Sequence, residues 1–197
     1  MSGTGGVVLR HAGIDRAFHW GMALTMFLLL GTSLLPILGL RFDWYGIHWV
    51  SGLVLTLLIL LHIVRAVIWQ RPRTMLLLGA DDFRSRGAGK YTLPQKLMHL
   101  AWAVAILVAI VTGLLLLPKA GVPFMERDPY AFTRGAWGVI GVLHDLSALL
   151  SVFLILVHVY FGILPEKRAY LRAMVKGFIT RSALAEEHDL KRVERGE

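Results

Sequence analysis

Four apolar runs, each long enough to cross a lipid bilayer, constrain this chain more than any other feature. A spanning helix needs about 20 predominantly apolar residues, and such windows lie near residues 17–38, 46–69, 96–118 and 138–163. Hydrophobic residues make up 56% of the chain, against roughly 45–50% in an ordinary soluble domain. The sequence therefore predicts an all-α, integral membrane four-helix bundle that forms a single domain over residues 1–197.

Lysine and arginine are distributed unevenly between the two ends of these runs. Of the 21 such residues, all but four fall on the side that carries both termini and the 70–95 link; the four on the other side are Arg41, Lys119, Arg127 and Arg134. Because cytoplasmic loops of membrane proteins are enriched in Lys and Arg, both termini are predicted to be cytoplasmic. The formal net charge of +8 follows from this asymmetry and requires no nucleic-acid partner.

The tail after the last apolar run, residues 164–197, is predicted to form a basic amphipathic helix at the inner membrane surface. Leu171, Met174, Val175 and Phe178 would lie on one side of that helix.

Histidines inside the apolar runs are the second informative feature. A polar ring in hydrocarbon is costly without a partner, so an intramembrane histidine marks a functional site by default. In the run 138–163, His144 and His158 lie fourteen positions apart, which places them on one helix face, about 21 Å apart along its axis. Haem iron with two axial imidazoles needs two rings from different helices at the same depth. The chain contains no cysteine, so any haem would be bound non-covalently.

Matching the depths of the histidines gives one clear pair and one open choice. Near the outer leaflet, His48 and His144 are at the same depth and form the predicted outer pair. Near the inner leaflet, three histidines compete for two axial positions: His19, His62 and His158. Spacing alone favours His62, since positions 48 and 62 repeat the interval seen in the last run. The competing interpretation, structural histidines in a haemless membrane anchor or small transporter, requires four rings to match in depth by accident.

Several longer motifs add a family resemblance over nearly the whole chain. They are IDRAFHW before the first run, IHWVSG, the last-helix histidine pair, GKYTLPQK, VTGLLLL and RAMVKGFITRSALAEEH. With these motifs the chain resembles the cytochrome b (gamma) subunit of membrane-bound formate dehydrogenases. Related cytochromes b of nickel–iron hydrogenases and thiosulfate reductases share the HW start and the last-helix pair, and they form the alternative interpretation.

The resemblance implies a dihaem b cytochrome with defined axial ligands. Carried over to this sequence, His19 and His158 would hold the inner haem, and His48 and His144 the outer haem. His62 is then left over, and it would hydrogen-bond a haem propionate, partner Arg65, or carry a proton toward the quinone. Met residues in the runs are expected to be core residues rather than ligands.

The resemblance also implies the two ends of an electron path in the bacterial inner membrane. Electrons would come from an iron–sulfur (beta) subunit, fed by a molybdenum or tungsten catalytic (alpha) subunit, so this chain would hold no catalytic residues of its own. The electrons would reach a quinone, either menaquinone or ubiquinone, at the cytoplasmic side. Its pocket would be lined by Tyr91, Thr92, Gln95 and His158, with Thr92 in place of a family asparagine. A different interpretation of Tyr91, Thr92 and Gln95 is an ordinary polar helix start.

Overall fold

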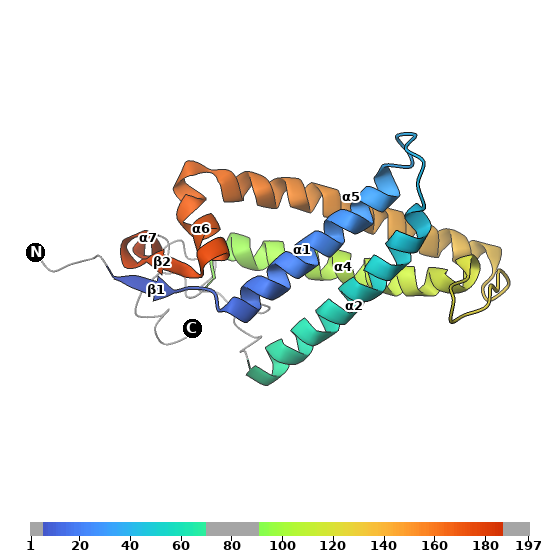
Figure 1. The fold of residues 1–197 in the computed structure, drawn as a ribbon, viewed down its shortest axis with the longest axis horizontal. Coiled ribbons are helices and arrows are strands. Elements are labelled where there is room, and N and C mark those ends of the chain that lie inside the picture. Colours follow the sequence, from blue (N-terminus) through green and yellow to red (C-terminus); the bar gives the residue numbers. More distant parts are fainter. Residues whose placement is uncertain (1–5, 70–90, 187–197) are drawn as a thin grey trace, which may run out of the picture. The chain divides into compact units, whose positions relative to one another are not determined.

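The computed structural model describes residues 6–69 and 91–186. In chain order the elements are β1 (Val7–Leu9), α1 (Gly13–Leu34), α2 (Trp44–Trp69), α4 (Leu93–Ala120), α5 (Arg134–Ile163), η2 (Pro165–Lys167), α6 (Arg168–Lys176), β2 (Phe178–Thr180) and α7 (Arg181–Ala185) (Figure 1). Most of the basic 70–95 link and the end of the tail lie outside the described residues.

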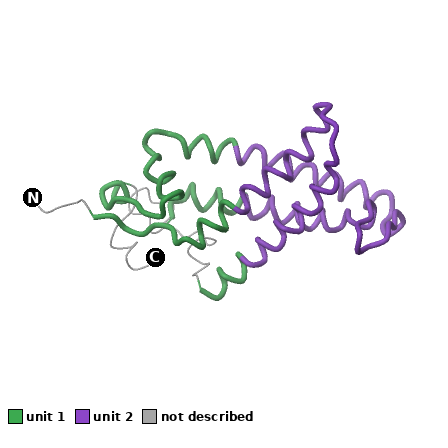
Figure 2. Tube along the Cα trace, in the orientation of Figure 1, with its two compact units in different colours: residues 1–20, 62–101, 156–197 green, residues 21–61, 102–155 purple. Residues whose placement is uncertain are grey.

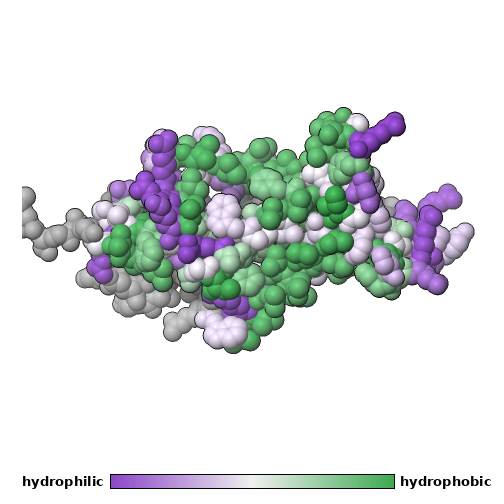
Figure 3. Space-filling view, viewed as in Figure 1, coloured by the Kyte–Doolittle hydropathy of each residue, from purple (hydrophilic) through white to green (hydrophobic). Residues whose placement is uncertain are grey.

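The prediction of an all-α protein with four helices of membrane-spanning length is confirmed. Helices α1, α2, α4 and α5 are each long and apolar enough to cross a membrane. Their large apolar side chains are mostly exposed, among them Phe27 at 57% and Leu156 at 64%, and apolar residues cover much of the helical surface in Figure 3. Outward-facing apolar side chains on long helices are what contact with lipid requires.

Local sequence signals explain where these helices begin and end. Asp43 accepts a hydrogen bond from the backbone N–H of Gly46 at the start of α2, and Thr133 accepts one from Ala136 at the start of α5. Both are N-caps, which satisfy backbone donors left free in a first helical turn. Helix α1 ends at Leu34 instead of the predicted residue 38, because Pro36 disfavours the helical conformation of the residue before it.

The chain forms two compact units, and each long helix contributes to both (Figure 2). Unit 1 contains residues 1–20, 62–101 and 156–197, and unit 2 contains residues 21–61 and 102–155. In unit 2 the four helices share one core, in which Met26, Leu30 and Leu55 are buried against Trp102, Ile106, Ala148 and Val152. Small buried residues such as Ala105, Ser147 and Ser151 let helix backbones approach closely, as in other membrane bundles.

The tail in unit 1 departs from the single amphipathic helix that the sequence predicts. Helix α6 ends at Lys176, and Gly177 follows with a φ of 94°, a left-handed conformation that glycine adopts without strain. Placing Phe178 on the same helix was therefore wrong. Phe178 begins β2, which pairs antiparallel with β1 so that Leu9 faces Phe178. Helix α6 remains the amphipathic element, and its place at the membrane surface stays a prediction.

Contacts with the tail hold the start of α1 in place within unit 1. The backbone N–H of Arg10 donates to the Gly177 carbonyl at 2.8 Å. The Arg16 guanidinium donates to the Val175 carbonyl, and the Trp20 indole N–H donates to the Met174 carbonyl at 3.4 Å. The tail thus fixes the first turns of α1, which carry His19.

Candidate functional site

Unit 2 brings together the two histidines of the predicted outer pair. His48 lies in the second turn of α2, and His144 lies in the third turn of α5. Their ring centres are 6.2 Å apart, with an angle of 74° between the ring planes. Two distant segments of the chain therefore meet at one point through their imidazoles.

Each of these two rings is held by a threonine of a different helix. Thr32 of α1 lies 2.9 Å from Nδ1 of His48, and Thr112 of α4 lies 2.9 Å from Nδ1 of His144, both measured from the hydroxyl oxygen Oγ1. Thr32 and Thr112 are 4% exposed. Neither threonine is among the residues predicted from the sequence, where the available signal is a hydroxyl within an apolar helix.

The threonine contacts decide which ring nitrogen carries the proton. The Thr32 hydroxyl lies 2.7 Å from the Leu28 carbonyl, and the Thr112 hydroxyl lies 2.6 Å from the Val108 carbonyl. A carbonyl oxygen only accepts, so each hydroxyl donates its one hydrogen there and accepts at its lone pairs. Nδ1 of His48 and of His144 must then be the donor, which leaves Nε2 of each ring with a free lone pair, as a metal ligand requires.

Gly113, next to Thr112, leaves space for the ring of His144. A Cβ atom at position 113 would lie 3.2 Å from Cε1 of His144, which is closer than two carbon atoms pack comfortably. Gly52, one turn after His48 in α2, has more space, since an added Cβ there would meet only Leu29, at an ordinary 3.9 Å.

Replacing Gly113 with alanine should displace the His144 ring and weaken binding at the outer pair. We expect the haem content of the purified variant to fall below that of the unmodified protein in a pyridine haemochrome assay. The matched control is Gly138→Ala in α5, where an added Cβ meets nothing within 4 Å. Equal haem contents in both variants would contradict the role assigned to Gly113.

Unit 1 brings together His19 of α1 and His158 of α5. Their ring centres are also 6.2 Å apart, with an angle of 45° between the planes. The ring of Trp20 packs edge-on against His19 at 4.9 Å. Nδ1 of His19 is buried and has no hydrogen-bond partner among the described residues, so this pair differs from the outer one.

His62, the reserve candidate, has a different environment in the same unit. Its ring packs edge-on against Phe18 at 5.8 Å, and its Nδ1 is buried with no hydrogen-bond partner in the described part of the chain. Arg65, one turn further along α2, forms an ion pair with Asp15 of α1. His62 would therefore have to compete with the Asp15 carboxylate for the Arg65 guanidinium.

The spacing of both pairs fits the axial ligands of a haem iron. A metal–imidazole bond is about 2.0 Å long and the nitrogen lies about 1.1 Å from the ring centre, so two rings on opposite sides of one ion have centres about 6 Å apart. Both pairs have ring centres at 6.2 Å, and each joins two different helices. Across residues 6–69 and 91–186, no group of three or more His, Cys, Asp or Glu side chains is placed to hold a metal ion.

The predicted quinone residues lie in unit 1, three of them at the start of α4. The Gln95 side-chain oxygen accepts from the backbone N–H of Thr92 at 3.1 Å, the return bond of a capping box. The Tyr91 ring lies 5.9 Å from the guanidinium carbon of Arg10, which also lies 6.0 Å from the ring of Tyr170. Burial raises the pKa of the Tyr170 phenol, which therefore stays neutral. The hydrogen bond to Thr92 gives Gln95 a structural role at the start of α4, and its amide N–H₂ group remains a donor.

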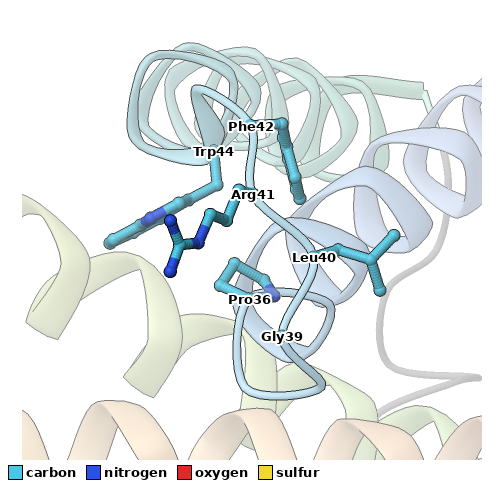
Figure 4. A pocket seen from close by; sticks show the side chains of 6 residues that line it. All are labelled: Pro36, Gly39, Leu40, Arg41, Phe42 and Trp44. Carbon is cyan, nitrogen blue, oxygen red and sulfur yellow. The ribbon is translucent and has the colours of Figure 1, made fainter.

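Two shallow hollows on unit 2 are formed by the links between its helices. One is lined by Pro36, Gly39, Leu40, Arg41, Phe42 and Trp44. In Figure 4 the side chains of Arg41 and Trp44 extend to the same side of the link, away from Leu40. The other includes Lys119, Arg134 and Trp137, and the Lys119 ammonium lies 5.4 Å from the centre of the Trp137 ring. Both hollows therefore combine a tryptophan with cationic side chains.

Comparison with known proteins identifies a family. The sequence model of the family described as prokaryotic cytochrome b561 matches residues 10–177, a range that includes both histidine pairs. Among curated proteins, none matches this sequence significantly.

Proposed function

The chain belongs to the prokaryotic cytochrome b561 family, and from this we propose that it is the dihaem cytochrome b subunit of a formate dehydrogenase, carrying electrons across the bacterial inner membrane to quinone. The family binds haem b, and the protein is a multi-pass membrane haem b electron-transfer protein. Beyond this, we propose that it holds two haems, that its partner is a formate dehydrogenase, and that electrons flow toward quinone.

The observation that carries the proposal is the equal spacing of two histidine pairs. His48 with His144, and His19 with His158, each have ring centres 6.2 Å apart. Haem b bound at such a pair supplies a one-electron couple at its iron. Helix α5 contributes one histidine to each pair, His144 and His158, so two haems along this helix would let one chain carry electrons between the two membrane surfaces.

The charge distribution supports the proposed orientation of the chain in the membrane. Unit 2, with His48 and His144, contains only four of the 21 Lys and Arg residues: Arg41, Lys119, Arg127 and Arg134. Unit 1, with His19 and His158, contains all the others. Because positive charge accumulates on the cytoplasmic side, the pair in unit 1 would be the inner one.

The quinone would bind in unit 1, beside the inner pair. Thr92 offers a hydroxyl and Gln95 an amide N–H₂ group, and both can donate to a quinone carbonyl. Reduction at this side takes up protons from the cytoplasm while electrons arrive from outside, so transfer would be electrogenic without a proton pump. Menaquinone and ubiquinone both present the required carbonyl oxygens.

The iron–sulfur partner would dock on the outer links of unit 2. The hollows with Arg41 and Trp44, and with Lys119, Arg134 and Trp137, present cationic and aromatic groups. Arginine and aromatic residues are enriched in protein interfaces, and the cationic groups would steer an acidic partner surface.

The test uses the complex isolated from its native membrane. We expect a reduced-minus-oxidised spectrum with a b-type α band, two haems per chain by pyridine haemochrome, haem reduction by formate, and reoxidation by added quinone. Haem reduction by hydrogen but not by formate would replace this proposal with the hydrogenase-type alternative. A preparation without an α band would favour a haemless anchor.

A further inference from the structure

We propose that Thr32 and Thr112 are positioning residues that lower the redox potential of the outer haem below that of the inner haem, and so give electron transfer its direction. This inference rests on the proposed function, because it requires a haem at each histidine pair. It assigns a role to two buried hydroxyls in apolar helices.

Each ring of the outer pair is hydrogen-bonded to a threonine of a neighbouring helix. Each threonine hydroxyl donates to a carbonyl of its own helix, at 2.7 Å for Thr32 and 2.6 Å for Thr112. Each therefore accepts from the Nδ1–H of its histidine across 2.9 Å. The same arrangement occurs twice, between α1 and α2 and between α4 and α5.

The hydrogen bond at Nδ1 affects the basicity of the opposite ring nitrogen, Nε2. When Nδ1–H donates to an oxygen, the imidazole becomes a more basic ligand through Nε2. A more basic ligand stabilises ferric over ferrous iron, which lowers the potential. With a threonine on each axial histidine, the effect acts from both faces of the haem.

In the inner pair, His19 lacks such a bond to any described residue. Nδ1 of His19 is buried, and the described residues provide no hydrogen-bond partner for it. His19 would accordingly be a weaker donor to iron than His48 or His144, and the inner haem would have the higher potential. Electrons that enter at the outer haem then move to the inner one spontaneously.

The experiment compares Thr32→Val and Thr112→Val in the intact complex by redox titration of the α band. Valine keeps the shape of threonine but removes the hydroxyl. We expect the lower-potential component to move upward, with about a tenfold rise in its reduced-to-oxidised ratio at a fixed ambient potential, or about 59 mV for a one-electron couple. The higher-potential component should stay in place.

Three further variants serve as controls. Thr25→Val removes an equally buried hydroxyl, 5% exposed, which donates to the Gly21 carbonyl of its own helix; it should leave both components unchanged. Thr32→Ser and Thr112→Ser retain the hydroxyl and should titrate like the unmodified protein. A shift in the Thr25 variant as large as in the other two would overturn the proposal.

A second measurement applies if a valine variant fails to retain haem. His19→Ala removes a ligand of the inner haem, so the remaining haem reports the outer potential directly. That potential should match the lower component of the unmodified protein; a match to the higher component would overturn the inference. If the valine variants still hold two haems and neither component shifts, the inference is overturned while the proposed function stays intact. A single haem in the unmodified protein would instead refute the proposed function itself.

Discussion

His144→Ala should remove one haem and leave the other bound. The His144 ring faces His48 at 6.2 Å, and an iron that loses one of two axial imidazoles loses half of its ligation by the protein. We expect the haemochrome assay to fall from two haems to one per chain. Redox titration should lose its lower-potential component, and the same result is expected for His48→Ala.

The control for this prediction is His99→Ala. His99 is a partly buried histidine of α4, the one long helix that contributes no predicted axial ligand. It should retain both haems. Two haems in the His144 variant, or one haem in the His99 variant, would show that the ligand assignment is wrong.

The sequence was sufficient to predict the four long helices and the meeting of His48 with His144. Runs of more than 20 apolar residues have few alternatives to a spanning helix. The helical rise and the predicted topology then give a depth for every histidine, and they predict that His48 and His144 lie at equal depth near the outer leaflet. The structure brings those two rings together, while their role as ligands stays a prediction.

The sequence was not sufficient where structure depends on contacts between distant segments. A periodic pattern through Phe178 suggested helix, but the pairing of Leu9 with Phe178 across β1 and β2 decides that segment. Thr32 and Thr112 were missed because each acts on a histidine of another helix. Their rotation toward the rings cannot be read from spacing along one helix.

The partner of His158 is the hardest case because depth alone does not choose between His19 and His62. Both lie in the inner halves of their helices. The regular interval from His48 to His62 favours His62, but such an interval gives only the depth of a residue and not its lateral position in the bundle. In the structure the ring beside His158 belongs to His19, whereas the ring of His62 lies beside Phe18.

His19→Ala should therefore cost the inner haem, and His62→Ala should not. We expect one haem per chain in the first variant and two in the second, counted by pyridine haemochrome in complexes of matched purity. In the His19 variant, formate should still reduce the remaining haem, because the outer pair is intact. Quinone should no longer reoxidise it at the original rate, because the inner relay is missing.

The two variants form a matched pair, since each removes a partly buried ring from a membrane helix of unit 1. Loss of a haem only in the His62 variant would transfer the ligand role from His19 to His62. Two haems in the His62 variant with slowed quinone reduction would instead support the role of proton carrier for this ring, whose Nδ1 is buried without a hydrogen-bond partner among the described residues. Unchanged quinone reduction would make His62 a packing residue against Phe18.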